Sequence, residues 1–183
     1  MGADLFAPQL LDNLPIDQRD VDVVAESFRV FPTVDFPVTH EQRVRAWRDW
    51  ATRRVVDRLT GLTERVAPPD MVVLTETDGW QQWSVRVAQL STLALPDLGG
   101  PLVDAVTRNS LSLARGATRA VLRGDHTTAG RLSRWVALLD GMGVSVPMDP
   151  ALLSDHVNLR GGTGPRVLLD LAIARRLLDR EPT

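Results

Sequence analysis

Between residues 101 and 142 the apolar positions recur every three or four residues, which is the period of a helix with one buried face. A polar segment at residues 123–127 divides them into two stripes. Gly124 is suited to end the first helix in a left-handed conformation, and Thr127 or Thr128 is suited to cap the second. The stripes are Leu102, Val106, Ser110, Leu113, Ala117 and Val121, then Leu132, Trp135, Val136 and Leu139. The pattern predicts a helical hairpin on which the other segments pack.

A second long helix is predicted at residues 39–67. Thr39 and Gln42 have the spacing of a capping box at its start, and the pair Pro68-Pro69 stops it. Its apolar stripe consists of Val44, Trp47, Ala51, Val55, Leu59 and Leu62.

Residues 71–95 fit two structures. The pair Asp78-Gly79 between apolar runs is a β-hairpin signal. The same residues fit a helix capped by Asp78, with Trp80, Trp83 and Val87 on one face. A lone hairpin is marginally stable in a helical chain, so we predict a helix at 79–95 and leave 70–77 open.

Beyond the central hairpin, a short helix is predicted at 150–157. A Gly-rich loop at 160–165 then precedes a final helix. The apolar spacing in this helix predicts an inner face of Val167, Leu168, Leu171, Ala172, Arg175 and Leu178. These elements together predict an all-α fold, with a single-domain bundle of five or six helices over residues 39–183.

Residues 1–38 are predicted to form an acidic N-terminal arm outside this bundle. Asp17 is suited to cap a short helix in the arm. The following Pro-punctuated segment at 30–38 cannot be helical. It contains Phe31 and Phe36, and it either covers the core of its own domain or docks on a partner.

The charges are distributed unevenly along the chain. Residues 1–40 hold seven carboxylates and two arginines, a net charge of −5, whereas residues 39–67 hold seven arginines and four carboxylates, a net charge of +3. This split predicts that the acidic arm lies across the Arg-rich helix. Nucleic acid is not an expected partner, because the isoelectric point is near 5.9 and the basic surface is confined to one helix.

Composition excludes several kinds of chemistry. The 183 residues contain no Lys, Cys or Tyr, and all 21 basic residues are Arg, a bias typical of GC-rich genomes such as those of actinobacteria. Schiff-base catalysis, thiol nucleophiles and thiolate metal sites are therefore absent. No apolar run reaches membrane-spanning length and no secretory signal is present, so the expected location is the cytoplasm.

The strongest binding candidates are two Trp-x-x-Trp pairs, Trp47/Trp50 and Trp80/Trp83. On helices each pair shares a face, and tryptophan is a favoured anchor at interfaces. Core packing is the simpler interpretation. Trp50, however, lies off the stripe of its helix, so we expect its ring to reach outward.

A weaker candidate is an anion site in the Gly-rich loop, formed by Arg160, Gly161, Gly162 and Arg166. Free amides at a helix start attract phosphate. However, no strand precedes the loop and Pro165 removes one donor.

The three histidines, His40, His126 and His156, do not have the spacing of a metal site, and no catalytic motif is found. We expect no metal or cofactor. The sequence favours a non-enzymatic adaptor that binds a protein partner, or itself, through Trp and Phe side chains. The alternative is a helical domain with a small-molecule pocket lined by Trp, Arg, His and Asp, which could also be an enzyme of biosynthesis.

Overall fold

The computed structural model of the chain describes residues 2–32, 36–61, 66–75, 79–161 and 164–180. These residues form ten α-helices and two short 3-10 helices, and no strand, so the all-α prediction is confirmed. In chain order they are η1 (Ala3–Phe6), α1 (Ala7–Leu11), α2 (Gln18–Val30), α3 (His40–Thr60), α4 (Val72–Thr75), α5 (Trp80–Gln89), η2 (Ser91–Leu93), α6 (Pro101–Arg108), α7 (Ser110–Leu122), α8 (His126–Gly141), α9 (Pro150–Arg160) and α10 (Pro165–Leu178).

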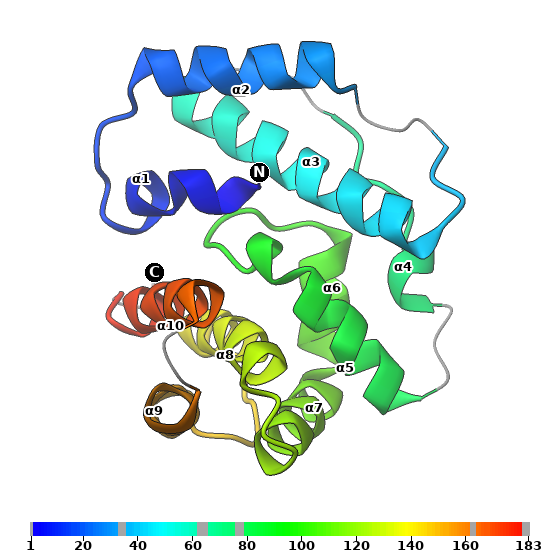
Figure 1. The fold of residues 1–183 in the computed structure, drawn as a ribbon, viewed down its shortest axis with the longest axis vertical. Helices are drawn as coiled ribbons and strands as arrows, with labels where there is room; N and C mark the ends of the chain where they lie inside the picture. The colour runs from blue at the N-terminus through cyan, green and yellow to red at the C-terminus, as the bar shows by residue number, and fades with distance from the viewer. Residues whose placement is uncertain (1, 33–35, 62–65, 76–78, 162–163, 181–183) are drawn as a thin grey trace.

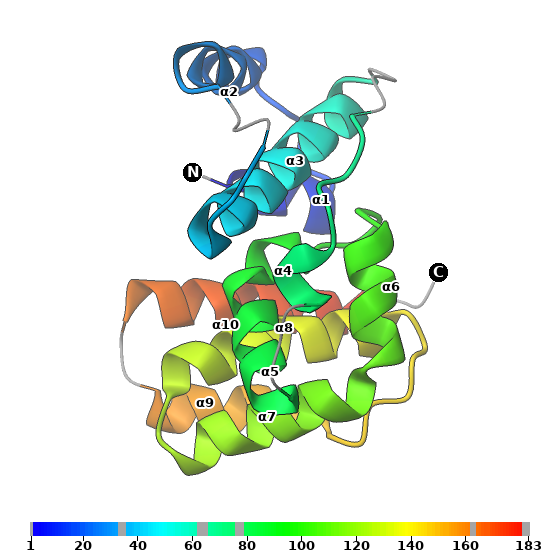
Figure 2. The same ribbon diagram turned by 90° about the vertical axis from the view of Figure 1, so that its right-hand side faces the viewer.

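The helices form two parts, one above the other. Helices α1, α2 and α3 make the upper part, and α5 to α10 make the lower bundle (Figures 1 and 2). Helix α8 lies at the centre of the bundle and packs against α5, α7, α9 and α10. Its predicted inner residues Leu132, Trp135, Val136 and Leu139 are fully buried, so this hairpin does organise the fold.

The central hairpin differs from its prediction in two details. Gly124 adopts the expected left-handed conformation, but Asp125, and not Thr127 or Thr128, caps α8 by accepting a hydrogen bond from the Thr128 amide. The predicted first helix is broken at Asn109 into α6 and α7. The Asn109 side chain donates to the Ala105 carbonyl at 2.8 Å, a local bond that competes with helix continuation.

Helix α3 begins as predicted and ends early. Both hydrogen bonds of the Thr39–Gln42 capping box are present. The helix stops at Thr60 because Gly61 is left-handed, with φ of +71°, so the predicted end at residue 67 is wrong. Leu62 lies outside the described residues.

Residues 80–89 are helical, which decides between the two structures predicted for this stretch. Gly79 occupies the N-cap position of α5, and the proposed cap Asp78 lies outside the described residues. The helix stops at Gln89 and is followed by the 3-10 turn η2, so it is shorter than predicted.

The start of the chain packs into the core. Phe6, Ala7 and Leu10 are buried where η1 and α1 contact α3 and α10. An acidic arm lying wholly outside the bundle is thus not confirmed, and neither is a count of five or six helices. Helix α2 is capped by Asp17 as predicted, and it lies beside α3 with the Arg53 guanidinium 4.5 Å from the centre of the Phe28 ring.

The inner face of α10 is rotated from its predicted position. Leu168, Ala172 and Arg175 are exposed. The buried positions are Val167, Asp170, Leu171, Ile173, Ala174 and Leu177. A buried Asp170 breaks the apolar pattern, and its partners are described below.

Helices α5 and α7 approach closely at Gly116. A β-carbon built on Gly116 would lie 2.2 Å from Cβ of Ser84, far inside van der Waals contact. The glycine therefore sets the separation of these two helices. The Trp135 indole of α8 donates to the Val87 carbonyl of α5 at 3.0 Å and holds the same helix from a second side.

We expect Gly116→Ala to lower the free energy of unfolding by about 2 kcal/mol or more, because neither backbone can move aside without disturbing the core. The matched control is Gly130→Ala in α8, where the added methyl would meet atoms no nearer than 3.6 Å. That change should be neutral or slightly stabilising, since alanine favours a helix over glycine. Equal denaturant midpoints for the two variants would contradict the tight crossing.

Candidate functional site

A closed network of four charged side chains lies between the N-terminus and the bundle. Arg134 of α8, fully buried, donates to Asp170 of α10 at 3.0 Å and to Asp4 of η1 at 2.8 Å. Arg166 of α10 bonds the same two carboxylates at 3.0 Å each. The two arginines and two aspartates alternate, so their formal charges cancel.

The network shifts the pKa of Asp4, one of its two carboxylates. Burial raises the pKa of the Asp4 carboxyl, but the charges and hydrogen bonds of Arg134 and Arg166 outweigh burial and leave that pKa below its ordinary value. All four groups are matched by opposite charges within the protein. The arrangement therefore holds η1, α8 and α10 together, and the buried Nε of Arg134 is left without a hydrogen-bond partner.

The Gly-rich loop is not assembled around an anion in the described residues. Arg166 is bound by Asp4 and Asp170, and the Gly161 amide donates to the Val157 carbonyl at 2.6 Å. Arg160 is exposed on α9, and Gly162 lies outside the described residues. An anion site here remains only a prediction, without support from this geometry.

Trp47 and Trp50 form a buried aromatic pair. Their rings meet edge to face with centroids 5.4 Å apart, and their indoles donate to the Asp70 and Val66 carbonyls at 3.0 and 3.1 Å. The expectation that Trp50 reaches outward is wrong, since it is only 6% exposed. The pair fixes residues 66–70 against α3.

The second tryptophan pair is divided between core and surface. Trp83 is buried, whereas Trp80 lies half-buried at the start of α5. Trp80 lines a shallow groove of about 600 Å³ along α7. The other lining residues are Leu111, Ala114, Arg115, Thr118, Arg119, Leu122, Arg123 and Pro147, and we refer to this surface as the α7 groove.

The α7 groove combines exposed apolar and basic side chains. Leu111 is 51% and Leu122 is 80% exposed. Arg115, Arg119 and Arg123 follow one another at intervals of one helical turn, and none has a carboxylate partner within the described ranges. Sequence reasoning missed these residues, although Leu111 and Leu122 lie off the inner stripe of the helix and could have indicated a second apolar face.

A second group of exposed apolar side chains lies in the connection between α2 and α3. Phe31 ends α2 and is 65% exposed, and Phe36 is 88% exposed. Val38 is also exposed. These three side chains are exposed, so the interpretation that they cover the core of their own domain is not confirmed. We refer to Phe31, Phe36 and Val38 as the Phe segment.

Beside Phe31, a cleft of about 500 Å³ opens between α2 and α3; these two helices lie side by side at the top of Figure 1. Its walls are apolar, from Val24, Phe28, Phe31 and Val44, and charged, from Glu41, Arg45, Arg48 and Asp49. Burial raises the pKa of the Asp49 carboxyl, and Arg45 at 3.7 Å compensates only in part. Arg48 donates to the Gln89 carbonyl at 2.8 Å, while its buried Nε has no hydrogen-bond partner.

In the part of the chain that the structure describes, no three His, Cys, Asp or Glu side chains converge on a point where they could hold a metal ion. Among the same residues no helix is of a length and apolarity to cross a membrane. Searches against protein-family models, curated proteins and solved structures find no match. The geometry of the surfaces is therefore the basis for a functional proposal.

We expect Asp4→Asn to lower the free energy of unfolding by about 3 kcal/mol at neutral pH, because it leaves a buried guanidinium partly uncompensated. The control is Asp20→Asn on the exposed face of α2, which should change stability by less than about 0.5 kcal/mol. Urea unfolding followed by circular dichroism measures both. Equal urea midpoints for the Asp4→Asn and Asp20→Asn variants would mean that the ion network contributes little to stability.

The difference between wild type and Asp4→Asn should also depend on pH. The folded pKa of Asp4 is lowered, so its contribution is complete above the unfolded pKa of about 3.9 and is lost as pH falls through the folded value. We expect the two unfolding free energies to converge as pH falls through this acidic window. A difference that stays constant with pH would contradict the charged pairing.

Proposed function

We propose that this protein is a cytoplasmic, non-enzymatic adaptor that binds protein partners through the α7 groove and the Phe segment. The observation that supports this proposal is the presence of two separate exposed apolar surfaces. Phe31 follows α2, which lies at the top of the long axis, Phe36 and Val38 precede α3, and α7 lies at the bottom (Figure 1). Two separated faces allow one chain to contact two partners at once.

The two faces have the chemistry of interfaces. Large apolar side chains as exposed as Phe36 and Leu122 lose water only when another molecule covers them. Trp80 adds an aromatic anchor beside arginine, and both residue types are enriched in the parts of interfaces that contribute most to binding. Trp47, Trp50 and Trp83 are buried, so they support the fold and not the contact.

The proposal predicts which substitutions remove a partner. A tagged copy is purified from its native host, and bound proteins are quantified by mass spectrometry. We expect Leu122→Asp to remove at least one stoichiometric partner, because a charge in the groove opposes burial. The matched control is Leu159→Asp on α9, which starts from the same 80% exposure but lies outside the groove.

The Phe segment is tested separately with Phe31→Ala/Phe36→Ala. Its control is Leu152→Ala/Leu159→Ala, which removes two similarly exposed apolar side chains from α9. Loss of a second, different partner would support two binding faces. Partners that persist in both the groove and Phe-segment variants would refute the adaptor hypothesis.

A small-molecule-binding protein is a second candidate, and the α2–α3 cleft favours it. Its volume of about 500 Å³ and its mixture of Phe, Arg and Asp side chains suit a small amphipathic ligand. Native mass spectrometry of the protein from its host provides the test. A monomer carrying one bound small molecule and no protein would support this alternative over the adaptor.

A further inference from the structure

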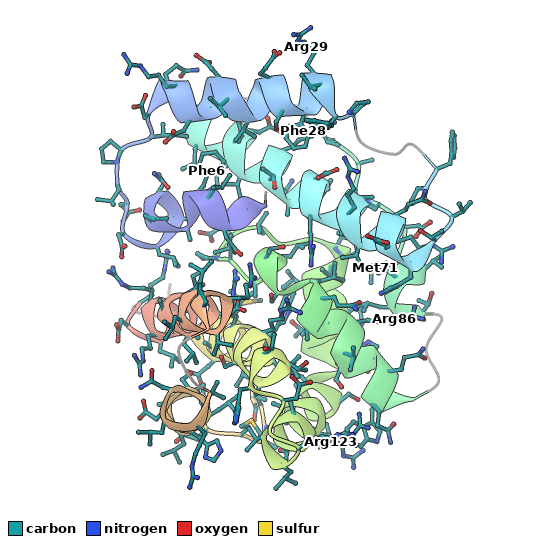
Figure 3. All side chains as sticks on the ribbon, viewed as in Figure 1. Phe6, Phe28, Arg29, Met71, Arg86 and Arg123 are labelled. Atoms are coloured by element: carbon teal, nitrogen blue, oxygen red, sulfur yellow. The ribbon has the colours of Figure 1, made fainter. Side chains whose placement is uncertain are left out.

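The residues that line the α7 groove indicate the chemistry of a partner that would bind there. Its apolar side chains, Trp80, Leu111 and Leu122, lie beside Arg115, Arg119 and Arg123. No acidic residue of the described chain lines it. Figure 3 shows Arg123 beside the end of α7, on the outside of the bundle. The groove is thus an apolar strip with a basic edge.

The basic edge has a regular spacing. The three arginines follow one another at intervals of four residues along α7, so successive side chains are about 6 Å apart. An α-helix lying alongside presents its own side chains at the same interval. Carboxylates on successive turns of such a helix would therefore meet successive arginines.

Resting on the proposed adaptor function, we propose that the α7 groove binds an amphipathic α-helix of a protein partner. The helix packs apolar side chains on Trp80, Leu111 and Leu122, and it aligns carboxylates one turn apart with Arg115, Arg119 and Arg123. The arginines give the charge that the partner must complement, and the apolar strip gives most of the buried area.

The groove fits this occupant better than single-stranded nucleic acid. Nucleic-acid grooves without sequence preference stack successive bases on several aromatic rings. Here Trp80 is the aromatic residue, and the remaining apolar lining is aliphatic, from Leu111, Ala114, Leu122 and Pro147. Aliphatic side chains pack well on the apolar face of a helix.

The test uses two synthetic helical peptides of about four turns with leucine along one face. One carries glutamate one turn apart beside the leucines, and the other carries lysine at the same positions. Binding to the full-length protein is measured by fluorescence anisotropy of a label on the peptide. We expect the glutamate peptide to bind about tenfold more tightly than the lysine peptide. Its affinity should fall as the sodium chloride concentration is raised.

The variant Arg115→Gln/Arg119→Gln should lower the affinity for the glutamate peptide by about tenfold and make that affinity less dependent on salt. The matched control is Arg19→Gln/Arg160→Gln, which removes the same charge from exposed positions on α2 and α9 and should leave binding unchanged. Leu122→Asp should abolish binding. Both double variants change exposed or half-exposed residues, and circular dichroism checks that they remain folded.

Equal affinity for both peptides, or no effect of the Arg115/Arg119 change, would overturn the acidic-helix proposal. A labelled single-stranded DNA that binds through the same arginines while the glutamate peptide does not would overturn it as well. These failures are distinguishable from failure of the adaptor function. If Leu122→Asp removes a native partner but Arg115→Gln/Arg119→Gln does not, the groove is an interface and only its assigned partner chemistry is wrong.

Discussion

The fold depends on the alternating ion network of Asp4, Arg134, Asp170 and Arg166. Arg134 is fully buried, and a buried guanidinium is tolerable only when carboxylates neutralise it; one of its two carboxylate partners is Asp4. The N-terminus must therefore return to the bundle for the buried charges to be compensated. This requirement explains why η1 and α1 pack between α3 and α10, although their sequence carries a net negative charge.

The network also limits where function can lie. Arg166, which follows the Gly-rich loop, is paired with the carboxylates of Asp4 and Asp170. Trp47 and Trp50 of α3 pack against residues 66–70. Polar and aromatic groups that resemble a site in the sequence are thus committed to the fold. The surfaces on which the proposals rest, the α7 groove, the Phe segment and the α2–α3 cleft, lie at the periphery.

Sequence periodicity predicted the apolar stripe of α8, but it did not reveal the polar groups that are buried beside such stripes, Arg134 in α8 and Asp170 in α10. The stripe of α8 and the capping box of α3 are local patterns, so both were predicted correctly. In α10 the buried Asp170 pairs with Arg134, 36 residues away, and no local pattern reveals a partner at that distance. The predicted inner face therefore combines the buried Val167 and Leu171 with the exposed Leu168, Ala172 and Arg175. The α7 groove was missed for a related reason, since it joins Trp80, Leu122 and Pro147 only after folding.

The two proposed faces differ in how firmly the fold holds them. Helix α7 is fixed against α5 by the contact at Gly116 and against the central helix α8, so the arginines along it keep their spacing. Little free energy of binding is then spent on ordering the groove when a partner helix binds. Phe36 and Val38 lie outside regular secondary structure, and a partner has to select their arrangement. A basic groove on packed helices and an exposed apolar segment outside regular secondary structure would suit two different kinds of partner, as the proposed adaptor function requires.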